Sequence, residues 1–335
     1  MKHKALAAAS ASIALLALAG CSAGGDGSGS ATGSTTSFPE RNITLVIPYD
    51  AGGSFDPAGR AYASLLEDEL GVSVIPENRP GAAATLGTKF VLDAEPDGYT
   101  IGLGSGSAAA FQPLVSDTGY DGVEDMQAIA KLGDSVQAIT VRADARWNSI
   151  KEFIDEAKAN PAVLKIGVAG LLSATDLQVS AIEHTLGVEF VHVPHEGGSG
   201  EALTSLLAGR VDAIVTTVNS VAPQFAANEV RPLVVMSRDE VGILPGVPTM
   251  ISEGYEIPGS PGQLYFIFGP LGIPEDVLKV LEEASLKVVQ SDEFKKFLDG
   301  AGMQGEPLGI EGTTEDLRAN QDAYATLVET LGIGK

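Results

Sequence analysis

The sequence predicts an α/β protein in which two units each combine a sheet with the helices that connect its strands. Short apolar runs alternate with amphipathic helical patterns along most of the chain, which is typical of strand–helix–strand crossovers. A first alternation ends near residue 107, and a second begins near residue 136. The 335 residues are enough for two domains of ordinary size.

The first alternation begins with a buried strand. Residues 43–47 form an apolar run of the kind that parallel sheets bury on both faces. Further strands are expected at 72–75 and 99–103, helices at 57–70 and 82–92, and a turn at 77–81.

The second alternation is longer, and the chain then returns to the first unit. Strands are expected at 136–141, 164–169, 188–193, 211–215 and 230–236, and helices at 149–159, 174–186, 201–208 and 221–227. Pro-rich turns occupy 244–261, a strand at 264–268 goes back, and helices follow at 275–290, 293–300 and 315–331. We therefore expect one lobe over 38–130 plus 264–335 and a second over 131–263.

The N-terminus has the pattern of an export signal. Lys2 and Lys4 precede an apolar run, and Leu18-Ala19-Gly20-Cys21 ends that run. Residues 1–20 resemble a lipoprotein signal peptide, which implies lipid on Cys21, although a signal peptide with a chance cysteine has the same pattern. The run is too short to cross a bilayer, and the Gly/Ser-rich residues 21–37 predict a flexible tether. We expect an exported protein anchored to the outer face of the cell membrane.

The charge and the cysteine content exclude several kinds of partner. A formal charge of −23 argues against nucleic acid and against an anionic membrane surface. Cys21 is the only cysteine, so internal disulfides and thiol metal sites are excluded. No pattern predicts a cofactor.

Polar and Gly-rich loops at the ends of strands are the candidate binding elements. Gly52 and Gly53 allow a sharp turn between the first strand and its helix, where backbone N–H groups and the helix dipole favour an anion. A structural turn without a ligand is the alternative at this position. The loops are 51–56, 104–107, 170–175, 197–199 and 216–220. Parallel sheets bind ligands beyond such strand ends, and amides and hydroxyls suit a carboxylate.

Catalytic patterns are missing or incomplete. The stretch GAAATLGTK at 81–89 has one residue too many between its glycines for a phosphate-binding loop, and no serine after residue 37 stands in Gly-x-Ser-x-Gly. His192 and His195 are three residues apart, which on a strand places them on opposite faces and disfavours a metal site. The sequence therefore does not predict an enzyme.

Five stretches of the sequence together form a recognisable pattern. In order they are IPYDAGGSFD, ENRPGAAATLGT, PDGYTIGLGS, FVHVPHEGGSGEALTSLLAGRVD and LPGVPTMISEG. In this order and spacing they resemble one known family, the tripartite tricarboxylate transporter substrate-binding proteins, also called Bug receptors. The resemblance runs from about residue 38 to the C-terminus. It implies a two-lobed periplasmic-binding-protein type II fold with a ligand cleft between the lobes. It also implies delivery of a small organic acid to one large and one small integral membrane subunit, by a receptor that we expect to be a monomer.

The resemblance assigns roles to two of the loops. It implies that Ala51, Gly52, Gly53, Ser54 and Asp56 hold one carboxylate with Tyr49 beside the ligand, and that Ser173 and its neighbours hold the other end. With the remaining strand-end loops, the expected ligand-binding residues are Tyr49, Ala51, Gly52, Gly53, Ser54, Asp56, Ser105, Ser107, Gly170, Ser173, Ala174, Thr175, Thr217 and Ser220.

The chain departs from the family pattern mainly in the second lobe. Phe55 replaces a frequent threonine in the first loop, while Leu171 and Leu172 stand in a loop that is usually Gly-, Asn- and Ser-rich. Asp176 replaces a frequent histidine, His195-Glu196 replaces Tyr-Lys, and Thr216 replaces a common aspartate. These changes favour a monocarboxylate or an aromatic acid over a citrate-like ligand, with dicarboxylates also among the expected acids.

The leading hypothesis is thus an extracytoplasmic receptor that captures a small organic carboxylate for a tripartite tricarboxylate-type transporter. One alternative is a sensor of the same fold that presents its ligand to a membrane signalling protein. A secreted hydrolase is a third possibility, which the missing Ser-His-Asp pattern disfavours.

Overall fold

The computed structural model describes residues 37–52, 55–195, 198–237, 239–257 and 263–333. The predicted signal peptide, Cys21 and nearly all of the predicted tether lie outside the described residues, as do Gly53 and Ser54. Within the described ranges, no helix is long and apolar enough to span a membrane.

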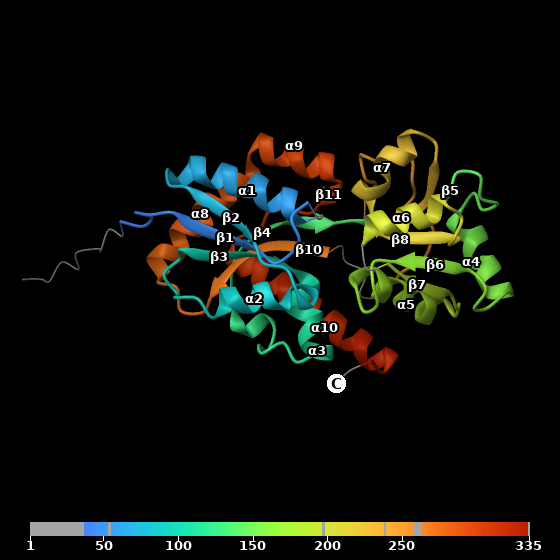
Figure 1. The fold of residues 1–335 in the computed structure, drawn as a ribbon, viewed down its shortest axis with the longest axis horizontal. Helices are drawn as coiled ribbons and strands as arrows, with labels where there is room; N and C mark the ends of the chain where they lie inside the picture. Colours follow the sequence, from blue (N-terminus) through green and yellow to red (C-terminus); the bar gives the residue numbers. More distant parts are fainter. Residues whose placement is uncertain (1–36, 53–54, 196–197, 238, 258–262, 334–335) are drawn as a thin grey trace, which may run out of the picture. The chain divides into compact units, whose positions relative to one another are not determined.

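The first sheet is mixed, with strand order β11-β4-β10-β3-β1-β2 (Figure 1). Its strands are β1 (Ile43–Ile47), β2 (Val74–Asn78), β3 (Thr100–Ser105), β4 (Met126–Ser135), β10 (Gln263–Pro270) and β11 (Met303–Gln304). β1 pairs in parallel with β2 and β3, as the alternation predicts, whereas β10 is antiparallel to both β3 and β4. β10 is the strand by which the chain returns from the second sheet. Because it is antiparallel to its neighbours, the first sheet is not purely parallel.

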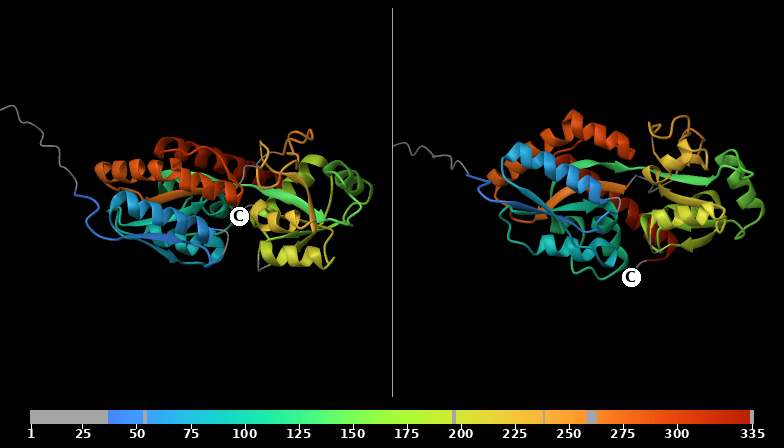
Figure 2. Two further views of the ribbon diagram at one scale, coloured as in Figure 1. Left: turned by 90° about the horizontal axis from the view of Figure 1, so that it is seen from above. Right: turned by 45° about the horizontal axis from the view of Figure 1, so that its top comes forward.

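Helices cover both faces of the first sheet. They are α1 (Phe55–Leu70), α2 (Thr85–Leu92), α3 (Gln112–Val115), α8 (Glu275–Gln290), α9 (Asp292–Ala301) and α10 (Ile310–Leu331). Buried side chains of α1, α8 and α9 share one core with the sheet, and those of α2 and α10 share another. Figure 2 shows α8 and α9, in orange, beside the blue α1.

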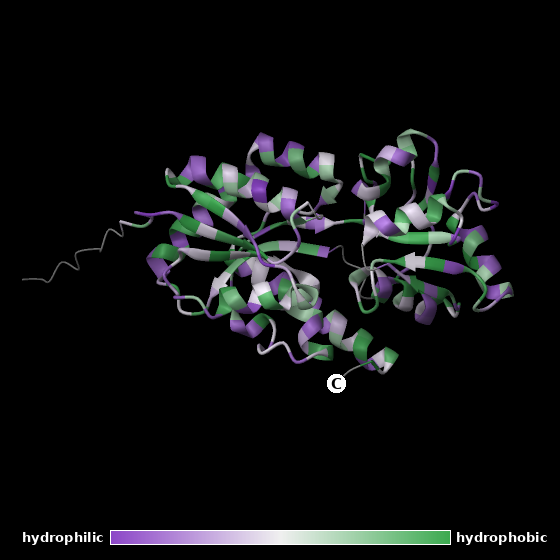
Figure 3. Cartoon of the chain, in the orientation of Figure 1, coloured by the Kyte–Doolittle hydropathy of each residue, from purple (hydrophilic) through white to green (hydrophobic). Residues whose placement is uncertain are grey.

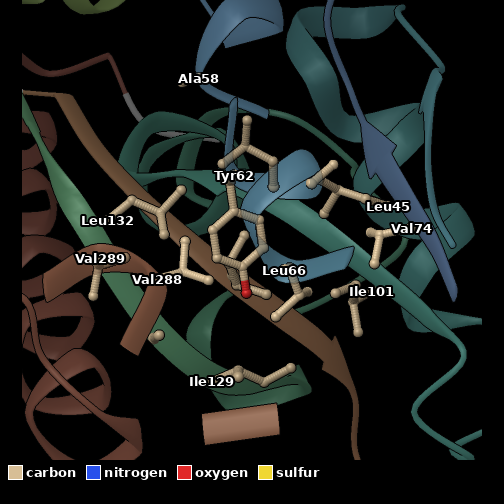
Figure 4. Packing of buried hydrophobic residues seen from close by; sticks show 14 of the residues in the cluster. Leu45, Ala58, Tyr62, Leu66, Val74, Ile101, Ile129, Leu132, Val288 and Val289 are labelled. Atoms are coloured by element: carbon tan, nitrogen blue, oxygen red, sulfur yellow. The ribbon is translucent and has the colours of Figure 1, made fainter. Parts of the chain in front are cut away.

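Tyr62 lies at the centre of the first of these cores. Its ring is surrounded by Leu66, Leu132 and Val288 (Figure 4), and its hydroxyl lies 2.6 Å from Oγ of Ser285 on α8. A buried hydroxyl without a partner would be costly, so this contact completes the packing of α1 against α8.

The second sheet has the order β7-β6-β8-β5-β9. Its elements are β5 (Gln137–Arg142), α4 (Ile150–Ala159), β6 (Lys165–Val168), α5 (Ala174–Leu186), β7 (Val191–Pro194), α6 (Ser199–Leu207), β8 (Ala213–Thr217), α7 (Val218–Ala226) and β9 (Val230–Val235). α4 and α5 pack on one face, and α6 and α7 on the other. Figure 3 shows the resulting pattern: mostly hydrophobic strands, and helices that alternate between hydrophobic and hydrophilic residues.

The C-terminal helix α10 also contacts α5, a helix of the second sheet. Leu177 and Ala181 of α5 belong to the same buried cluster as Leu327 and Val328 of α10. α5 is therefore packed on both sides, against its own sheet and against α10.

Most expected elements are present within a few residues, and helices 174–186 and 275–290 have the predicted bounds. β4 and the two-residue β11 are strands that the sequence did not predict, and the predicted turn at 77–81 overlaps the end of β2. β4 remains in the first sheet as far as Ser135, beyond the predicted lobe boundary at 130/131. The lobe boundaries themselves stay a prediction.

Candidate functional site

In the first lobe, the candidate loop (residues 48–52) leads from β1 towards α1 and is held by Asp56. Oδ2 of Asp56 accepts the backbone N–H of Gly52 at 2.9 Å. Oδ1 accepts from Nε of Arg60 and from Nδ2 of Asn78, each at 2.9 Å. The hydrogen bond from Arg60 is the main reason that the pKa of Asp56 falls to about 2. The carboxylate thus stays charged and acts as a fixed support of this first-lobe loop, with its two oxygens already in use.

Tyr49 connects the first-lobe loop to the end of β3. Its hydroxyl donates to Oγ of Ser105 at 2.5 Å, and that Oγ lies 3.3 Å from Oγ of Ser107. Nε2 of Gln263, the first residue of β10, donates to the Ser107 hydroxyl at 3.4 Å. Burial raises the pKa of Tyr49 to about 12, so the phenol remains a neutral donor. The row Tyr49–Ser105–Ser107–Gln263 is a connected set of hydroxyl and amide groups.

Phe55 does not add an exposed ring to the first-lobe loop. The ring is 2% exposed and lies between those of Tyr49 and Tyr265, with both centroid distances 3.9 Å and near-parallel planes. The replacement of a hydroxyl by a ring therefore changes the core beneath this loop. It does not place an aromatic surface on it.

In the second lobe, the candidate loop (residues 169–173) joins β6 to α5 in a similar way. Ser173 is the N-cap of α5, and its Oγ accepts the N–H of Asp176 at 3.3 Å. Oγ1 of Thr175 accepts the N–H of Ala169 at 2.9 Å and lies 2.9 Å from Oγ of Ser173. Oδ2 of Asp176 accepts the N–H of Leu172 at 2.8 Å, as Asp56 does for Gly52.

The third group of candidates lies at the end of β8. Thr217 is the last residue of that strand and precedes α7, and its Oγ1 lies 2.8 Å from Oγ of Ser220. Thr217 is buried and Ser220 half-buried.

The structure thus brings the described candidates together as three sets. Tyr49, Ser105 and Ser107 form the first, with Gly52 and Asp56 adjoining through the first-lobe loop, whereas Ala51 is exposed on that loop. The second set contains Ser173 and Thr175, with Gly170 buried and Ala174 the first residue of α5. The third is Thr217 with Ser220. Gly53 and Ser54 lie outside the described residues.

Sequence reasoning missed the partners that support these loops. Asn78 donates to Asp56 and also to the carbonyl of Tyr49, at 3.0 Å, and Gln263 reaches Ser107. His192 of β7 contacts Asp176, with Nδ1 2.6 Å from Oδ1. Asn78 and His192 both stand on the strand next to a loop-bearing strand, and Asn78 ends β2, which is the signal that would have identified it. His192 is the second residue of β7, opposite Ile166, so its position on the strand gives no such signal.

The two histidines lie on opposite faces of the second sheet. His192 contacts Asp176 of α5, whereas the His195 ring packs over Gly167 and Ile214 on the face that α6 covers. Within the described ranges, no cluster of three or more His, Cys, Asp or Glu side chains is arranged to hold a metal ion.

A large cavity lies away from the predicted loops. It has a volume of about 1160 Å³, and none of the described candidate residues lines it. Its walls carry the carboxylates of Asp134, Asp239, Glu256, Asp299, Glu306 and Asp316 and the ammonium groups of Lys131 and Lys295. This excess of negative charge disfavours an anionic ligand there.

The candidate loops suit an anion better. The first-lobe loop lies just before α1, and the second-lobe loop and Thr217 lie directly before α5 and α7, so the candidates adjoin the first turns of these helices. In a first turn, backbone N–H groups lack helical acceptors and the helix dipole is positive. Arg60 is occupied by Asp56 and Asn78. Recognition here would rest on amides and hydroxyls.

Comparison with known proteins identifies the family to which this chain belongs. The family model of the "Tripartite tricarboxylate transporter family receptor" matches residues 59–316. A UPF0065 protein of Bordetella pertussis is 31% identical over 80% of this chain and 82% of its own length. A TctC solute-binding protein from Polaromonas, solved without ligand, is 31% identical, with a TM-score of 0.74 over 87% of this chain and 99% of that one.

A third relative was solved with a bound acid. Rpa4515 from R. palustris with adipate is 26% identical, with a TM-score of 0.78 over 89% of this chain and 99% of that one. The family match covers most of this chain, and the structural matches cover nearly the whole of each relative. The chain belongs to the tripartite tricarboxylate transporter receptor family, whose members are two-lobed periplasmic solute receptors and not enzymes.

Proposed function

We propose that this receptor captures a small organic carboxylate between its lobes and delivers it to the membrane subunits of a tripartite tricarboxylate-type transporter. The main support for this proposal is the pair of loops that precede α1 and α5, each fixed by an aspartate that accepts a hydrogen bond from a loop amide. Loops held in this way keep their remaining amide and hydroxyl donors in place before the ligand arrives, which lowers the entropy cost of binding. The proposed ligand contacts are the candidate residues of both lobes, Gly53 and Ser54 included, except that Asp56 acts through the Gly52 amide that it holds.

The ligand class follows from the second-lobe loop. Leu171 is 65% exposed and Leu172 43% exposed, so this loop presents apolar surface beside the N-terminus of α5. A ligand with a carboxylate at one end and an apolar body would use both features. We therefore propose a monocarboxylate or an aromatic acid. A dicarboxylate with an apolar middle, such as the adipate bound to Rpa4515, is the next class to consider.

Thermal unfolding of residues 38–335, refolded free of carried-over ligand, tests this function. The panel is hexanoate, adipate, benzoate and citrate, because hexanoate and adipate differ by one carboxylate at equal chain length. A ligand at about a hundred times its dissociation constant adds roughly 2.7 kcal/mol to the free energy of unfolding. We expect hexanoate or benzoate to raise the melting temperature and citrate to leave it unchanged. Stabilisation by citrate alone would contradict the ligand class, and no response to any acid would contradict the function.

A pair of leucine variants tests the contribution of the second-lobe loop. Leu171→Ser is expected to weaken hexanoate binding and to leave acetate binding unchanged, because acetate lacks the apolar chain. Leu271→Ser is the control, since Leu271 is also half-exposed but lies just after β10. Equal losses in both variants, or a loss for acetate, would exclude the proposed apolar contact.

We further propose that the exported chain is anchored through lipid on Cys21 and acts as a monomer. The basic start, the apolar run and Leu18-Ala19-Gly20-Cys21 support the anchor. In the full chain, Cys21→Ser should move the receptor from the membrane fraction to the soluble exported fraction. Cys21→Ser should also abolish labelling by a radioactive fatty acid. A variant that stays membrane-bound would show that another element provides the anchor. Light scattering of residues 38–335 tests the monomer.

Delivery to a carrier requires the membrane subunits. Uptake of a radiolabelled acid from the panel, by cells that contain both subunits, should depend on this receptor and disappear when it is deleted. A receptor that binds the acid without supporting uptake would favour the sensor hypothesis.

A further inference from the structure

His192 lies between two carboxylates of the same helix. Its Nδ1 is 2.6 Å from Oδ1 of Asp176, and its Nε2 is 3.1 Å from Oε2 of Glu183. A carboxylate can only accept hydrogen bonds, so both ring nitrogens must carry a proton to make both contacts. The ring is therefore an imidazolium in this arrangement. The hydrogen bonds to Asp176 and then to Glu183 raise the pKa of His192 to about 9.

Asp176 transmits this contact to the second-lobe loop. Its Oδ1 faces His192, while its Oδ2 accepts the N–H of Leu172 at 2.8 Å. Leu172 has φ 55°, a left-handed conformation that a leucine rarely adopts unless its surroundings hold it there. Gly170, in the same loop, has φ 95°. The hydrogen bond from Leu172 to Asp176 is thus a restraint on a loop that would otherwise relax.

The first lobe contains the same arrangement without a titratable cation. Oδ2 of Asp56 accepts the N–H of Gly52, and Oδ1 is held by Arg60 and Asn78. An arginine keeps its charge at every pH at which the protein is folded. The two carboxylates have the same task, but only the one in the second lobe depends on a histidine.

We propose that His192 is a positioning residue whose proton holds the second-lobe loop in place through Asp176, so that a neutral His192 releases this loop while the first-lobe loop stays fixed. A neutral imidazole has one N–H and can donate to only one of the two carboxylates, which leaves a lone pair facing the other. The consequence for ligand affinity rests on the proposed function. The consequence for the loop does not.

Few other charged groups surround the ring in the described part of the chain. On α5, Asp176 and Glu183 contact it, and the neighbouring His184 is exposed. β7 is an edge strand, and its partner β6 places the uncharged Ile166 opposite His192 and Lys165 opposite Val191. The titration of the ring is therefore governed by the two carboxylates.

Nuclear magnetic resonance of ligand-free residues 38–335 tests the proposal. The amide signals of Leu172 and Gly52 and the imidazole signals of His192 are followed from pH 6 to pH 10.5. We expect the Leu172 signal to shift with the midpoint at which the His192 ring loses its proton, while Gly52 does not shift at that midpoint. A Leu172 signal that ignores the ring titration, or equal shifts of both amides, would overturn the proposal.

Three variants separate positioning from general stability. His192→Phe, which has no N–H donor in its ring, should leave Leu172 in the released state at every pH. Glu183→Gln should keep Leu172 in place up to pH 10.5, because the amide can donate to Nε2 of a neutral ring whose Nδ1–H still reaches Asp176. The new amide oxygen can still accept the N–H of Phe190, which now bonds to Oε1 of Glu183 at 2.6 Å. His184→Gln is the matched control and should behave as the unaltered protein. A pH-dependent Leu172 signal in Glu183→Gln would contradict the role of the second carboxylate.

Binding of adipate, used as a probe, tests the consequence for the site. Above the His192 midpoint the apparent affinity should fall about tenfold per pH unit, and Glu183→Gln should remove this fall. An affinity that does not depend on pH in the unaltered protein would overturn the link between loop and ligand. If adipate does not bind at any pH, adipate is not a ligand of this protein. The amide signals of Leu172 and Gly52 then still test the role of His192.

Discussion

The hydroxyl of Tyr49 donates a 2.5 Å hydrogen bond to Oγ of Ser105, which joins the start of the first-lobe loop to the end of β3. Ser105 is buried and Tyr49 is half-buried, so a variant that breaks the bond loses more than an exposed contact would.

Tyr49→Phe is expected to lower the free energy of unfolding by about 1 kcal/mol, because one partly buried hydrogen bond is lost while Ser105 still accepts the N–H of Ala108. Urea unfolding measures the change. Tyr99→Phe is the control, since its hydroxyl accepts from the exposed Glu40 amide. Equal effects in both variants would mean that the Tyr49 bond has no special role.

Phe55→Ala should cost about 3–5 kcal/mol, because it removes a buried ring from between Tyr49 and Tyr265. Phe90→Ala is the control, because Phe90 is 40% exposed and should cost much less. The measurement is again urea unfolding. A Phe55→Thr variant as stable as the unaltered protein would contradict the buried position of the ring.

Asp56 should make stability depend on acid pH. Its folded pKa of about 2 lies below the ordinary 3.8, so its contribution is fully present above 3.8 and is lost as pH falls towards about 2. The stability difference between the unaltered protein and Asp56→Asn should therefore shrink over that interval. Asp68→Asn, an exposed change on the same helix, supplies the reference curve. A difference that stays constant down to pH 2 would be inconsistent with the low pKa.

Lys131→Met should destabilise the first lobe by about 1–3 kcal/mol, because it leaves the half-buried Asp134 without its cation. Nζ of Lys131 lies 2.9 Å from Asp134 and 2.6 Å from Asp316, and burial already raises the pKa of Asp134. Thermal and urea unfolding should agree on the loss. Adding Asp134→Asn should restore part of it, and the exposed Lys296→Met should cost little. Without that partial rescue, the loss would have another cause.

Lys131 also explains the main error in the fold prediction. Its strand, β4, contains Lys131, Gly133 and Asp134, which are typical of a loop. In the fold the strand is almost entirely buried, and Lys131 pairs with Asp134 and with Asp316 of α10. Lys131 and Asp316 are far apart in the sequence, so their ion pair produces no local sequence pattern from which β4 could be predicted. The apolar periodicity that predicted α5 and α8 is local, which is why their bounds were correct.

The candidate loops could be located from the sequence, but their supports could not. Gly52 and Ser173 stand next to recognisable strand ends and helix starts. Phe55 belongs to the core only because Tyr265 arrives from a distant strand to cover it. His192 resembles an ordinary strand residue until Asp176 and Glu183 are placed against it.

Two glycines of β3 leave room for two phenylalanine rings of β10. Gly102 and Gly104 stand opposite Phe268 and Phe266 of β10, and a Cβ on Gly104 would lie 2.3 Å from the Phe266 ring. A larger residue on one strand requires a smaller one on the other. These four positions therefore restrict one another in size, and a Gly-x-Gly segment matched to a remote Phe-x-Phe segment supplies a distance restraint for threading unfamiliar sequences onto this fold.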